Sequence, residues 1–134
     1  MLTASMVMRS ACVGNMRIVE TALAHLANVT VAKAQDALYG GTSAFNSLYR
    51  NSGLPATCTG LIRAAGQVER ELRDAKRVLS EENFARRLIE QVMTGDGAMP
   101  AAERAKYLDF IGRYSGERIR LIATRLREGL VSAA

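Results

Sequence analysis

Few side chains in this sequence are of the types that do chemistry, and they are scattered. His25 is the only histidine, and Cys12 and Cys58 are the only cysteines. A zinc site needs several His or Cys ligands, and a nucleophilic site needs a base beside a thiol or hydroxyl. The two thiols are too far apart in sequence to form a metal or redox motif. We therefore expect no catalytic residue, no metal and no cofactor, and interpret the cysteines as small buried residues.

The other candidates for catalysis or ligand binding are better explained by local structure. Glu81 and Glu82 are adjacent, so on a helix they point in different directions, and both suit a first turn where acids favour the dipole. Gly40 and Gly41 follow a predicted helix and lack the lysine and hydroxyl of a phosphate loop. An enzyme is the least expected class of function.

Basic side chains are the remaining candidates for ligand contact. The candidate anion contacts form two short clusters, namely Arg86 with Arg87 and Arg118 with Arg120. Acidic residues lie near both clusters, so a solvated helix face explains them as well. The net charge of +5 allows weak attraction to nucleic acid or to an anionic surface. Nucleic-acid binders more often show clusters of one sign with aromatic residues between them, so nucleic-acid contact is only weakly supported.

Charge is distributed unevenly along the chain. Residues 1–60 contain four of the eighteen basic groups and two of the thirteen acidic groups, and the rest follow residue 60. The first half is therefore a weakly charged stretch of small residues. Such a surface is poorly suited to facing water alone and well suited to packing against another protein, which favours association over chemistry.

Apolar periodicity predicts an all-α fold in a single domain over residues 1–134. Residues 1–39 are expected to form a long low-charge helix, and residues 40–60 a loop with a short helix. Residues 55–94 are either one helix or a kinked pair, and residues 98–131 form a C-terminal helix. The predicted architecture is an elongated helical bundle or helical hairpin whose long N-terminal helix is weakly charged.

The predicted N-terminal helix has an apolar seam of the kind found in coiled coils. Its members repeat at spacings of 4, 3, 4 and 3: Cys12, Met16, Val19, Leu23 and Leu26. A helix over residues 3–38 would be about 50 Å long, which is too long for the rest of the chain to cover. We expect the five seam residues to mediate self-association, and Leu23→Asp to dissociate the oligomer.

The leading functional hypothesis is a non-enzymatic structural or assembly subunit, such as a filament, phage-like or coat component. Its partners would be other copies of itself or a second assembly protein. The alternative is a small basic helical regulator or adaptor that binds nucleic acid or a partner protein, and a third is an amphipathic protein on an apolar or membrane surface. No apolar run is long enough to span a bilayer, and no basic segment precedes the apolar N-terminus. We expect a cytoplasmic location, or a place in an assembly made there.

Overall fold

The computed structural model describes residues 3–95 and 97–133, and within these ranges every regular element is a helix. The elements in chain order are α1 (Ala4–Val13), α2 (Met16–Ala27), α3 (Val31–Leu38), α4 (Thr42–Ser52), the 3₁₀-helix η1 (Ala56–Cys58), α5 (Thr59–Asp74), α6 (Glu81–Thr94), α7 (Ala101–Tyr114) and α8 (Glu117–Ala133). The all-α prediction is confirmed, and a helical bundle is consistent with the arrangement. None of the helices in this part of the chain has the length and apolarity needed to cross a membrane.

The predicted long N-terminal helix is wrong, because two left-handed residues interrupt it. Gly14 has φ +84° and ends α1, and Asn28 has φ +56° and ends α2. A residue in the left-handed region terminates an α-helix and redirects the chain. Thr30 then starts α3, because its side-chain oxygen accepts a hydrogen bond from the Lys33 amide at 3.2 Å. Residues 4–38 are therefore three short helices.

Helix boundaries in the second half of the chain settle one open expectation and overturn another. The expected helix over 55–94 is two helices, since Lys76 has φ +53° and the Ser80 hydroxyl caps α6 by accepting from the Asn83 amide. The expected single helix over 98–131 is wrong. Its chain turns at Ser115, which is extended (φ −114°, ψ 172°), and α7 and α8 lie on either side of that turn.

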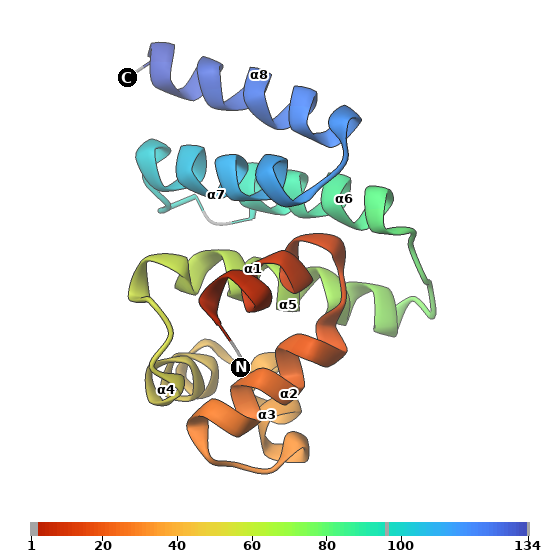
Figure 1. The fold of residues 1–134 in the computed structure, drawn as a ribbon, viewed down its shortest axis with the longest axis vertical. Helices are drawn as coiled ribbons and strands as arrows, with labels where there is room; N and C mark the ends of the chain where they lie inside the picture. Colours follow the sequence, from red (N-terminus) through yellow and green to blue (C-terminus); the bar gives the residue numbers. More distant parts are fainter. Residues whose placement is uncertain (1–2, 96, 134) are drawn as a thin grey trace.

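The helices form successive layers along the long axis of the molecule (Figure 1). Helices α2, α3 and α4 lie at one end, α1 and α5 in the middle, and α6 and α7 beyond them. Helix α8 is outermost, packs chiefly on α7, and turns its other side away from the body. The outermost hairpin of α7 and α8 thus has one exposed side.

The core runs through these layers and is made mostly of aliphatic side chains. Apolar residues at helical spacing along α5 are buried, namely Leu61, Ala65, Val68 and Leu72. The largest fully buried side chain is Tyr107 of α7. Its hydroxyl donates to Glu103 at 2.6 Å and accepts from the Gly60 amide at 3.2 Å, so it ties α7 to the start of α5.

A single carboxylate, Glu20, is buried among the described acidic residues, with 2% of its surface exposed. It accepts hydrogen bonds from Gln35 at 2.9 Å, from the Tyr39 hydroxyl, and from Arg73 at 2.8 Å. The Arg73 guanidinium also lies 4.4 Å from the centre of the Tyr39 ring. This cluster joins α2, α3 and α5, and its donors satisfy the buried charge.

Candidate anion-binding groove

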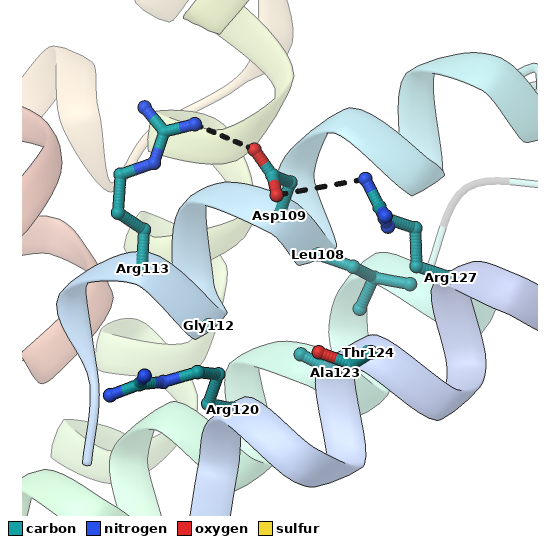
Figure 2. A pocket seen from close by; sticks show the side chains of 8 residues that line it. All are labelled: Leu108, Asp109, Gly112, Arg113, Arg120, Ala123, Thr124 and Arg127. Carbon is teal, nitrogen blue, oxygen red and sulfur yellow. Dashed lines mark hydrogen bonds and ion pairs between the residues drawn. The ribbon is translucent and has the colours of Figure 1, made fainter. Parts of the chain in front are cut away.

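A groove of about 370 Å³ runs between α7 and α8 (Figure 2). Its walls are Leu108, Asp109, Gly112 and Arg113 from α7, and Arg120, Ala123, Thr124 and Arg127 from α8. The α8 residues follow the spacing i, i+3, i+4, i+7, which places them on one face of that helix. The groove therefore depends on the turn at residues 115–116, which folds this face of α8 onto α7.

The two helices approach each other closely at Gly112. A Cβ atom there would already touch the Ala123 Cβ at 3.4 Å and the Arg120 Cα at 3.6 Å. This packing fixes the backbone of Arg120 at the point of closest approach. The Arg120 side chain begins beside Gly112 and extends away from Asp109 and Arg127 (Figure 2).

One carboxylate in the groove pairs with two of the three guanidinium groups there. Asp109 pairs with Arg113 at 2.8 Å and with Arg127 at 3.7 Å, and Figure 2 shows it between these two side chains. The Arg120 side chain makes no hydrogen bond or ion pair with any residue in the described part of the chain. The lining residues carry three positive charges and one negative charge, so the groove is electropositive by about two charges.

The Asp109 ion pairs are weak enough to rearrange. The side chains of Asp109, Arg113 and Arg127 are 43%, 57% and 45% exposed, respectively. Ion pairs at such exposure contribute at most about 1 kcal/mol, because water screens them. An anion that enters the groove would break only these weak pairs to reach Arg113 and Arg127, and would break no ion pair to reach Arg120.

The four arginines predicted to contact anions are dispersed. Only Arg120 lies in the groove, and Arg118 is exposed elsewhere on α8. Arg86 is exposed on α6. Arg87 is held by Glu71, to which its Nε donates at 2.9 Å, and by Gln91. The structure thus separates the predicted clusters and brings none of them together at one site.

The residues predicted to mediate self-association lie inside the chain. Cys12, Met16, Val19 and Leu23 are at most 1% exposed, and Leu26 is half-buried. The seam packs against this chain's own helices, because α1 packs on α5 and α6, and α2 packs chiefly on α3 and α4. Self-association stays a prediction, and four of these five side chains are buried within the chain.

Sequence reasoning missed three of the groove's charged residues: Asp109, Arg113 and Arg127. In one continuous helix, Asp109 and Arg120 would be separated by about 16 Å at 1.5 Å per residue. Only the turn between α7 and α8 brings them together. The available signal was the spacing of Asp109 and Arg113, which is that of a helical ion pair, and of Arg120 and Arg127, which share a face.

The cysteines are packed rather than reactive. Burial raises the pKa of the Cys12 thiol to about 12, and the nearby Cys58 adds to this effect. A thiol with so high a pKa is protonated at neutral pH and is a poor nucleophile. His25, at the end of α2, is exposed. No group of three His, Cys, Asp or Glu side chains is arranged to hold a metal ion within residues 3–95 and 97–133.

Comparison with known protein families gives a match over most of the chain. A family described as "Uncharacterised protein conserved in bacteria (DUF2336)" matches residues 1–100. The chain belongs to this family. The DUF2336 match covers α1 to α6 and stops before α7, so both walls of the groove follow the matched segment. No curated protein and no solved structure matches the chain.

The DUF2336 segment has a polar groove of its own, along α5. It measures about 100 Å³ beside α3 and includes Arg63, Gln67 and Arg70. Arg70 already donates to the Tyr39 carbonyl at 3.2 Å. This α5 groove is smaller than the one between α7 and α8, and one of its two arginines is engaged by the backbone.

Proposed function

We propose that the protein is a non-enzymatic helical adaptor that holds an anionic partner in the groove between α7 and α8. The observation that supports this most is Arg120, an exposed side chain in the groove that forms no ion pair with any described residue. Arginine presents several N–H donors in a planar fork and binds carboxylates and phosphates in bidentate fashion.

The composition of the groove favours binding over catalysis. Among its eight described lining residues, Thr124 provides the hydroxyl and Asp109 the carboxylate. A nucleophilic mechanism would need a base beside the hydroxyl, and Asp109 is instead directed at Arg113 and Arg127. The set of residues can hold and orient a negative charge but contains no matched acid and base.

Arg120→Gln is expected to remove most of the anion affinity without affecting folding. Inorganic phosphate, added at constant ionic strength, should raise the melting temperature of the wild-type chain by a few degrees once the site is occupied. The variant should lose this rise, because the unpaired guanidinium is gone. Thermal unfolding followed by circular dichroism gives both the starting stability and the shift.

Arg118→Gln is the matched control, since Arg118 is also exposed on α8, lies outside the groove, and removes the same charge. It should keep the rise seen with the wild-type chain. Equal shifts in all three proteins, or no shift in any of them, would contradict the proposed anion site.

Assembly is the second candidate function, and one observation favours it. A shallow groove of about 350 Å³ in the low-charge half is lined by five small or apolar residues together with three polar or charged ones, which are Lys33, Asp36 and Asn51. Val29 is 36% exposed there. Light scattering tests this candidate: a mass well above 14.5 kDa that falls in Val29→Asp would support it, and a monomer at high concentration would count against homo-assembly.

A further inference from the structure

We propose that the anion bound between α7 and α8 is the phosphate monoester of a phosphorylated peptide. This inference rests on the proposed adaptor function and adds the chemical class of its partner. It follows from three properties of the groove, which are its net charge, the placement of its guanidinium groups on both walls, and the neutral surface between them.

The charge of the groove matches a phosphate monoester better than a carboxylate. Arg113, Arg120 and Arg127 together with Asp109 give a surplus of two positive charges. A phosphorylated side chain carries about −1.5 to −2 at pH 7. A carboxylate brings only one negative charge, the same as Asp109, and would leave half of the surplus uncompensated. Because Asp109 already provides one negative charge, a ligand needs more than one negative charge to displace it from Arg113 and Arg127.

The guanidinium-bearing side chains come from both walls of the groove. Arg120 and Arg127 project from one face of α8, and Arg113 comes from α7 on the opposite wall (Figure 2). A phosphate monoester has three terminal oxygens that accept hydrogen bonds, so donors on two walls can each find an acceptor. Asp109 holds Arg113 and Arg127 near the groove beforehand, which reduces the ordering needed on binding.

The space between the charged groups is neutral and suits a short side chain. Leu108, Gly112 and Ala123 are buried residues that line the groove. These residues offer contact to methylene and backbone atoms rather than to further charges. A peptide that presents one phosphate on a short side chain fits this combination of charged and apolar lining residues.

A nucleic acid fits the groove less well. Stacking on aromatic rings is the common basis for binding single strands, and none of the eight lining residues is aromatic. A polyanionic backbone would also bring successive phosphates past the Asp109 carboxylate and past Glu117 and Glu128, which α8 carries at its exposed positions. The groove is suited to one phosphate rather than to a row of them.

The test compares three fluorescent peptides of one sequence that differ at a single central position, carrying phosphoserine, aspartate or serine. Fluorescence anisotropy is measured with the wild-type chain, Arg120→Gln and Arg118→Gln. We expect the phosphopeptide to bind at least about tenfold more tightly than the aspartate peptide, since charge-assisted hydrogen bonds are lost with each missing oxygen. Arg120→Gln should weaken the phosphopeptide by about tenfold, and Arg118→Gln should leave it within about twofold.

The results separate this inference from the adaptor function beneath it. Equal binding of the phosphoserine and aspartate peptides, with both weakened by Arg120→Gln, would overturn the phosphate class and leave the adaptor function standing. Absence of any binding that depends on Arg120 would overturn both. A labelled single-stranded oligonucleotide that binds more tightly than the phosphopeptide, and loses this in Arg120→Gln, would overturn the inference in favour of nucleic acid.

Discussion

Leu23→Asp is expected to unfold the chain rather than to separate one copy from another. Leu23 is fully buried and belongs to the core cluster formed with the other helices. Burial of an ionised carboxylate without a partner costs several kcal/mol. This is a large share of the roughly 5–15 kcal/mol that stabilises a typical domain. Urea denaturation followed by circular dichroism should find the variant unfolded, or nearly so, in the absence of urea.

Leu121→Asp is the control for this substitution, because Leu121 is 54% exposed on α8. It should change the free energy of unfolding by no more than about 0.5 kcal/mol. A folded Leu23→Asp chain with a smaller mass than the wild-type protein would contradict the intramolecular packing. That result would return the Cys12–Leu26 seam to a contact between copies.

Glu20→Gln is expected to destabilise the chain by about 2–3 kcal/mol at neutral pH, since hydrogen bonds to a charged group contribute about that much. Burial by itself raises the pKa of Glu20. The hydrogen bonds from Gln35, Tyr39 and Arg73, with the positive charge of Arg73, outweigh burial and hold this pKa below its ordinary value of 4.5. The ionised form is therefore the one that the fold stabilises.

The same substitution is expected to change the response of the fold to acid. Because the folded-state pKa of Glu20 is lowered, its contribution to stability is complete above pH 4.5 and is lost as the pH falls through the folded-state value. The difference in unfolding free energy between wild type and Glu20→Gln should therefore be largest near neutral pH and shrink below pH 4.5.

Glu90→Gln provides the comparison for Glu20→Gln, since Glu90 is 64% exposed and lies 3.9 Å from Arg87. It should cost well under about 1 kcal/mol, as exposed pairs do. Urea titrations of both variants at several pH values give the required free energies. A difference between wild type and Glu20→Gln that stayed constant down to acid pH would show that the buried carboxylate does not carry the stability.

The helical content of the chain could be predicted from its sequence, but the ends of several helices could not. Periodic apolar residues mark a buried face regardless of whether the helix continues, so the seam through Cys12 and Leu23 runs across the break at Gly14. That break depends on one residue with φ +84° whose Cβ would lie 2.6 Å from the Phe84 ring. The contact with Phe84 is tertiary, so the spacing of apolar residues near Gly14 does not predict it.

The Cys12–Leu26 seam is interpreted from sequence as a contact between copies because spacing alone does not reveal tertiary contacts. Spacings of 4 and 3 arise wherever one helix face is covered, and they do not say whether the cover belongs to the same chain. A single helix about 50 Å long would need a second copy of the chain to cover its apolar face. Once residues 4–38 fold back as three helices, the chain's own helices supply the cover, α5 and α6 over α1, and α3 and α4 over α2.

The candidate site was only partly accessible to sequence reasoning. Arg120 was identified as a basic residue near other basic residues, which is a property of the sequence. Its companions Asp109, Arg113 and Arg127 come together through the turn at Ser115, and the sequence pattern there resembled a weak point within one helix. A cluster of charges from the two sides of a turn can be predicted only after the turn itself has been located.

The most direct test of the groove is a map of the amide chemical shifts that change when the chain binds an anion. A ¹⁵N-labelled sample is titrated with inorganic phosphate, and with the phosphoserine peptide, at constant ionic strength. We predict that the shifts concentrate at residues 108–113 and 120–127, on the two walls of the groove. Shifts centred on Arg63, Gln67 and Arg70 of α5, with α7 and α8 unchanged, would contradict it.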